Sequence, residues 1–124
     1  MDVIKVAAKS RPFKVAGAVA GVFREHKQAV VQAIGAGAVN QAVKALILAR
    51  QYLAQDGYHV AFIPQFTEIE IQGQVRTAVR FTVIAVPADL DPVPLEPLPA
   101  SSTAQIQQNE EAERASSSQE GGES

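Results

Sequence analysis

Groups suited to binding an anion gather in two short segments of the sequence. The first is Gly35-Ala36-Gly37, a turn between a strand-like run and a long helix, which leaves the first N–H groups of that helix without intrahelical acceptors. Such N–H groups attract anions, phosphate above all. The second segment holds Lys9 and Arg11, just before Pro12. The two segments predict an anion-binding surface, and a turn that serves only chain geometry is the alternative for the glycines.

Residues for catalysis or for metal binding do not gather in this way. Ser10 lies outside any Gly-x-Ser-x-Gly motif, His26 and His59 are far apart, and the chain contains no cysteine. The glycine turn also falls short of the G-x-G-x-x-G dinucleotide fingerprint, because Asn40 stands at the last position. The sequence therefore predicts a binding protein and not an enzyme, with no catalytic residue, no metal and no cofactor.

Hydrophobic periodicity predicts the elements that must position the two segments. We expect strands at 2–8, 28–34, 58–64 continued by 67–72, and 75–86, with helices at 12–26 and 38–55. The first two strands are joined by a helix, so we expect them to be parallel, with their carboxyl ends at the same edge of the sheet. The fold class predicted is α+β: a β-α-β-α-β-β two-layer sandwich with a four-stranded mixed sheet and both helices on one face.

Three local features carry more specific expectations. A loop of three residues, 72–74, is expected between the last two strands, with Glu70 opposite Arg76. Pro64 predicts a bend and an edge position for its strand. Leu48 falls near the polar side of the second helix, which indicates a second burial, such as a subunit interface.

The distribution of charge divides the chain. Residues 1–87 hold ten Lys and Arg against five Asp and Glu, whereas residues 88–124 hold one Arg against eight acids. Four prolines between 92 and 99 predict a linker, and the Ser-, Gln- and Glu-rich residues 101–124 predict disorder. We therefore expect one domain over 1–87 and a tail over 88–124. With no signal peptide and no run long enough to span a bilayer, a cytoplasmic protein without membrane contact is expected.

Three stretches resemble one known family. They are KVAAKSRPFKVAGAVAGVFRE, VQAIGAGAVNQAVKALILAR and FIPQFTEIEIQGQVRTAVRFTV, and together they resemble the stage V sporulation protein S family over residues 2–86. The resemblance implies an Alba-like fold, a regulatory role in spore development, a homodimer or homotetramer, and nucleic acid, either DNA or RNA, as the partner.

Basic residues and the glycine turn together give the candidate nucleic-acid-binding residues. Alba-like proteins carry arginines beside the glycine of this turn and a lysine at the helix start, but Ala36 and Gln41 are uncharged here. From this departure we expect one of three things: weaker binding of nucleic acid, binding through backbone N–H groups, or a different anion as the ligand. A protein-interaction module and a small anionic-ligand sensor at the glycine turn are the alternative functions. The candidate residues are Lys9, Arg11, Lys14, Gly35, Gly37, Asn40, Lys44, Arg76 and Arg80.

Overall fold

The structure, a computed structural model, describes residues 2–100 of the chain. It divides into two compact units, Met1–Val93 and Pro94–Ser124, and the first unit contains the sheet and the two long helices. The disorder expected for residues 101–124 lies outside the described residues.

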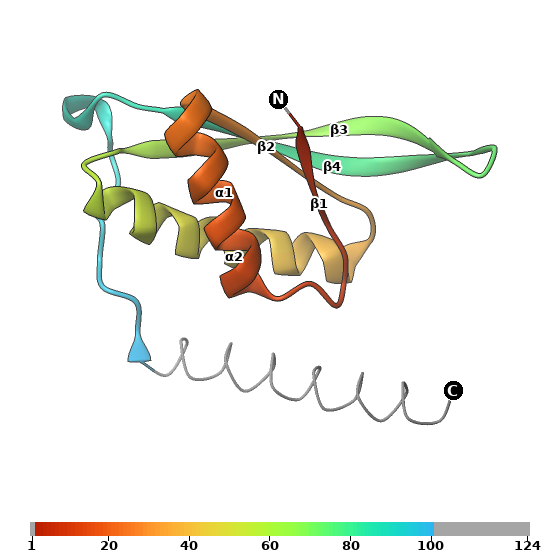
Figure 1. Ribbon diagram of the computed structural model, residues 1–124, viewed down its shortest axis with the longest axis horizontal. Coiled ribbons are helices and arrows are strands. Elements are labelled where there is room, and N and C mark those ends of the chain that lie inside the picture. Colours follow the sequence, from red (N-terminus) through yellow and green to blue (C-terminus); the bar gives the residue numbers. More distant parts are fainter. Residues whose placement is uncertain (1, 101–124) are drawn as a thin grey trace. The chain divides into compact units, whose positions relative to one another are not determined.

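The first unit has the predicted element order (Figure 1). The strands lie in the order β1-β2-β4-β3, with β1 and β2 parallel and the other neighbours antiparallel. The predicted α+β architecture, a four-stranded mixed sheet with two helices on one face, is thereby confirmed. The elements are β1 (Val3–Val6), α1 (Pro12–His26), β2 (Gln28–Ala33), α2 (Ala36–Gln55), β3 (Val60–Ile71), β4 (Gln74–Ala85) and the short 3₁₀ helix η1 (Ala88–Leu90).

Local signals explain where the two helices begin and end. Pro12 occupies the first position of α1, where a missing N–H costs nothing, and Lys27 ends α1 in the left-handed region with φ 59°. Helix α2 begins at Ala36, two residues earlier than expected, because Gly35 itself adopts φ 88° and completes the change of direction.

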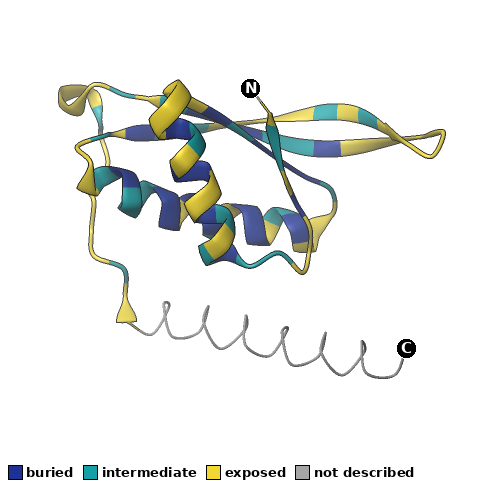
Figure 2. Cartoon of the chain, in the orientation of Figure 1, coloured by how far each residue is buried: buried dark blue, intermediate teal, exposed yellow. Residues whose placement is uncertain are grey.

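The core lies between the helices and one face of the sheet (Figure 2). Alternate residues of β2 and β4 are buried there, and Phe23 of α1 is 0% exposed, with its ring edge-on to Tyr58 at 5.3 Å between centroids. Each such buried side chain stabilises the fold by roughly 1.5–3 kcal/mol. Because side chains alternate along a strand, the residues between them point to the opposite, helix-free face. The buried strand residues are Ala29, Val31, Ala33, Phe81 and Val83.

Helix α2 is buried over a wide part of its circumference. It packs against both α1 and the sheet, so the second burial expected for Leu48 lies within the chain, where that side chain is 1% exposed. Gln41 is buried as well. By contrast, Val43 is 40% exposed and Ile47 is 49% exposed.

The hairpin of β3 and β4 differs from the predicted register by one residue. Gln72 and Gly73 both have positive φ, 52° and 79°, as a two-residue turn that suits the twist of the strands requires. The expected three-residue loop is therefore wrong, and Glu70 lies opposite Val75 instead of Arg76. Strand β3 is an edge strand, as predicted, but it continues through Pro64 as one strand of 12 residues.

Candidate functional site

The loop after β1 and the turn after β2 lie in contact. The parallel pairing of β1 with β2 ends at Val6 and Ala33, so both strands lead to the same edge of the sheet. A Cβ added to Gly37 would lie 3.0 Å from the Cβ of Ala8. The structure thus brings together the two segments predicted to bind an anion, the one that holds Lys9 and Arg11 and the turn Gly35–Gly37. We call residues 7–11 together with 35–37 the rim.

Two hydrogen-bonded ties hold the rim in shape. Within the loop, the N–H of Ala7 donates to the Ser10 hydroxyl at 2.9 Å and the N–H of Ser10 donates to the Ala7 carbonyl at 3.0 Å. Between the segments, the side-chain amide of Gln41 donates to the Ser10 carbonyl at 2.8 Å. This hydrogen bond accounts for the burial of the polar Gln41 side chain, because it satisfies the amide and joins the loop to the first turns of α2.

The N-termini of both helices lie at the rim. No side chain caps either one, and no acidic residue occupies the first turn of α1 or α2. In α2 the first intrahelical bond joins the Val39 N–H to the Gly35 carbonyl at 3.0 Å, so the N–H groups of residues 36–38 precede the helical ladder. Each helix end attracts an anion by about 0.3–1 kcal/mol.

Most of the candidate nucleic-acid-binding residues lie on the rim or on the two helices that begin there. Lys9 and the glycine turn are exposed, and Arg11 is half-buried at the N-terminus of α1. Lys14 lies one turn along α1, on the side of Arg11. Asn40 and Lys44 are one turn apart on α2 and share a side in the same way.

The two hairpin arginines are placed elsewhere. Arg76 is exposed on the projecting part of β4, opposite Ile69. Arg80 belongs to the central strand β4 and its side chain lies on the helix-free face of the sheet. There its guanidinium donates to the Gln32 side-chain oxygen at 2.8 Å. Arg80 is thus paired within the sheet and does not belong to the loop or to the glycine turn that form the rim. Sequence reasoning missed Gln32 as its partner, although Gln32 stands out as a polar residue among the apolar residues 29–34.

Two carboxylates of the first unit, Asp56 and Asp91, form ion pairs away from the rim. Asp56 follows α2 and accepts a hydrogen bond from Arg24 at 2.6 Å. Asp91 contacts the ring of His59 at 3.0 Å and the guanidinium of Arg50 at 3.5 Å. The His59 contact, then the Val93 N–H, and further the Arg50 charge hold the pKa of Asp91 below its usual 3.8. Since α2 spans about 30 Å, Asp56 does not neutralise the positive rim.

The fold and the rim define a small α+β domain with a positively polarised edge formed by two helix N-termini and a basic loop. A family model described as Stage V sporulation protein S (SpoVS) matches residues 2–86. The chain belongs to this family, as its sequence indicates. Among solved structures, it is similar to "Alba from Thermoplasma volcanium", with a TM-score of 0.44 and 17% identity, over 67% of this chain and 99% of that chain.

Neither a membrane-spanning helix nor a metal-binding group is found among the described residues. No helix within residues 2–100 is both long and apolar enough to cross a membrane. In the same range, no three His, Cys, Asp or Glu side chains form a group that could hold a metal ion.

Proposed function

We propose that this chain is a regulatory nucleic-acid-binding protein whose rim contacts the phosphate backbone. The observation that carries the proposal is the meeting of the basic loop with two uncapped helix N-termini, marked by the close approach of Ala8 and Gly37. Backbone N–H groups, lysines and arginines are the usual partners of phosphate oxygens, and they position a protein without reading sequence. The family resemblance supports the same partner.

The neutral glycine turn sets the expected character of the binding. At Gly35–Gly37 the contacts come from backbone N–H groups, so charge is supplied by the neighbouring loop and helices. Four cations on the rim or on the helices that begin there contribute: Lys9, Arg11, Lys14 and Lys44. If each contacts one phosphate, the logarithm of the affinity falls with the logarithm of salt concentration with a slope of about −3.6. The affinity then drops roughly 150-fold between about 50 and 200 mM salt.

Exposed apolar side chains support self-association as a homodimer or homotetramer. On α2, Val43 is 40% exposed and Ile47 is 49% exposed; on the hairpin, Phe66 is 78% exposed and Val75 is 66% exposed. Burying such side chains against a second copy removes apolar surface from water. A dimer would also present two rims to one nucleic acid, which raises the avidity. Light scattering after size exclusion measures the oligomeric state directly.

The test is a filter-binding titration of the full chain with DNA and with RNA at two salt concentrations. Replacing Lys9 and Arg11 by alanine should reduce the salt slope by about 1.8 and weaken binding to all sequences alike. The matched control replaces Arg24 and Lys27, which carry the same charge at the other end of α1. Affinity that ignores both the salt and the rim variant would overturn the proposal.

A protein-interaction module is the second candidate, because the same exposed Phe66 and Val75 suit a protein partner. This function predicts a complex that survives nuclease treatment and is lost when Phe66 is replaced by a charged residue. The rim variant would leave that complex intact, so the two functions give opposite results with the same two variants.

A further inference from the structure

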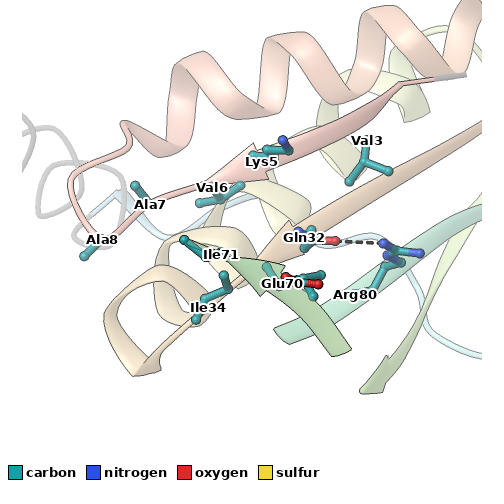
Figure 3. Close-up of a pocket in the computed structure, with 11 residues that line it drawn as sticks. Val3, Lys5, Val6, Ala7, Ala8, Gln32, Ile34, Glu70, Ile71 and Arg80 are labelled. Carbon is teal, nitrogen blue, oxygen red and sulfur yellow. Dashed lines mark hydrogen bonds between the residues drawn. The ribbon is translucent and has the colours of Figure 1, made fainter. Parts of the chain in front are cut away.

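A hollow of about 590 Å³ lies on the helix-free face of the sheet (Figure 3). It is bounded by β1 and the residues after it, by β2, by β4 and by the tip of the hairpin. The walls are largely aliphatic, and four residues bring polar or charged groups to them. The aliphatic residues are Val3, Val6, Ala7, Ala8, Ile34, Ile69 and Ile71, and the polar ones are Lys5, Gln32, Glu70 and Arg80.

The strand register explains how the polar groups come together. Lys5 pairs with Gln32 across β1 and β2, and Gln32 pairs with Arg80 across β2 and β4. Cross-strand partners point to the same face, so these three side chains form one row across the sheet. Each comes from a different strand, and no sequence motif joins them.

Arg80 has hydrogen-bonding capacity that the protein leaves unused. Its guanidinium is oriented by the bond to Gln32, whose own side chain is buried at 7% exposure. Within residues 2–100, the buried Nε of Arg80 has no hydrogen-bond partner. Buried polar groups are usually paired, and a guanidinium prefers a planar oxyanion such as a carboxylate. The side chain is therefore held in place and incompletely paired at the wall of the hollow.

We propose that this hollow binds a small aliphatic carboxylate, with its anionic end on Lys5 and Arg80 and its hydrocarbon part against Val3, Ile69 and Ile71. The formal charges of the lining, two positive and one negative from Glu70, match a single negative charge. The aliphatic walls match a short or branched carbon chain.

The same lining argues against the nucleic acid as occupant. None of the residues around the hollow is aromatic, so a base would find no ring on which to stack. Binding here is a property separate from phosphate contact at the rim, and it takes Arg80 out of the set of phosphate contacts.

Occupation of the hollow would join two parts of the fold. Lys5 belongs to β1, whereas Ile69 and Ile71 belong to the hairpin beyond its pairing with β2. A bound carboxylate touches both, so it holds the hairpin tip against the body. The hollow thus provides a means by which a small metabolite restricts the hairpin.

The test is an NMR titration of the full chain, labelled with ¹⁵N, with isovalerate and with its neutral isostere isovaleramide. Isovalerate should shift the amide signals of Lys5, Gln32 and Ile69–Ile71 in a saturable way, with a dissociation constant in the millimolar range. Isovaleramide should bind at least about tenfold more weakly, because it lacks the charge. R80Q should weaken isovalerate binding by a similar factor. R76Q removes a cation from the same face outside the hollow, and it should change nothing.

Several outcomes would overturn the proposal. They are the absence of a saturable shift, equal binding of acid and amide, or equal binding by R80Q and the unaltered chain. Shifts of the same residues by inorganic phosphate or an oligonucleotide, but not by isovalerate, would assign the hollow to the nucleic-acid surface. If R80Q does not fold, K5Q gives the same comparison. The isovalerate titration contains no nucleic acid, so its failure is distinct from a failure of the proposed function.

Discussion

Replacing Gly37 by alanine tests the contact that holds the two rim segments together. The new Cβ would lie 3.0 Å from the Cβ of Ala8, whereas two carbon atoms at ease are about 3.5–4.0 Å apart. The loop of residues 7–11 must therefore move away by about 0.5–1 Å. The loop cannot do so freely, because Ser10 bonds both to Ala7 and to Gln41.

Two opposing effects set the expected change in the free energy of unfolding. Alanine in place of glycine stabilises a helix by up to about 1 kcal/mol. Crowding of a packed contact costs about 1–3 kcal/mol. The G37A chain should therefore be destabilised by about 0–3 kcal/mol. Gly17 is the matched control, because a Cβ added there would meet no described atom within 4 Å apart from its chain neighbours and the backbone of its own helix. G17A should stabilise the chain by about 0.5–1 kcal/mol.

The measurement is urea unfolding of four chains: the unaltered chain, G37A, A8G and the double variant. A8G removes the methyl group that the new Cβ meets, so the double variant should recover the cost of crowding. We expect a coupling energy of about 1–2 kcal/mol between the two positions, with an unchanged dependence on urea. Coupling below about 0.3 kcal/mol would mean that the segments do not touch, and the rim would lose its physical basis.

Three further predictions concern other parts of the first unit. Asp91 has a lowered pKa, so its contribution to stability is present above the usual carboxyl value of 3.8 and is lost as pH falls through the lower, folded value. The D91N chain should consequently be less stable than the unaltered chain at neutral pH, and the difference should shrink below about pH 4 in thermal unfolding. Asparagine tolerates the positive φ of Gln72 better than glutamine, so Q72N should raise the unfolding free energy by up to about 1 kcal/mol; a decrease would contradict the turn geometry. Removing the fully buried ring of Phe23 in F23A should cost about 3–5 kcal/mol, whereas V43A, at a position 40% exposed, should cost less than about 1 kcal/mol in the same assay.

The fold was predictable because local signals and burial agree over most of the first unit. Pro12 marks the start of α1, and the alternation of apolar residues marks the strands. The hairpin register was not predictable in the same way, because most of both faces of its projecting part are exposed and burial does not select one register. The register of the hairpin is instead set by its two-residue turn, in which Gln72 and Gly73 both have positive φ.

The rim was predictable, whereas the hollow was not. Parallel strands bring their carboxyl ends to one edge, which is a rule of topology that needs no side-chain detail. The row of Lys5, Gln32 and Arg80 depends on the register of three strands, which only the assembled sheet defines. The burial of Gln41 and the exposure of Ile47 were not predictable for a related reason: a helix that packs on two partners does not bury one periodic stripe.

The contacts of Asp91 and Val93 with Arg50 bear on how the protein can be shortened. The Arg50 guanidinium donates to the Val93 carbonyl at 2.6 Å and reaches the Asp91 carboxylate. A chain cut after residue 87, where the composition changes, would lose both acceptors and leave Arg50, whose side chain is 23% exposed, without them. A chain cut after Val93 would keep both acceptors. The contacts of Arg50, and not the change of composition after residue 87, therefore determine where the chain can be truncated.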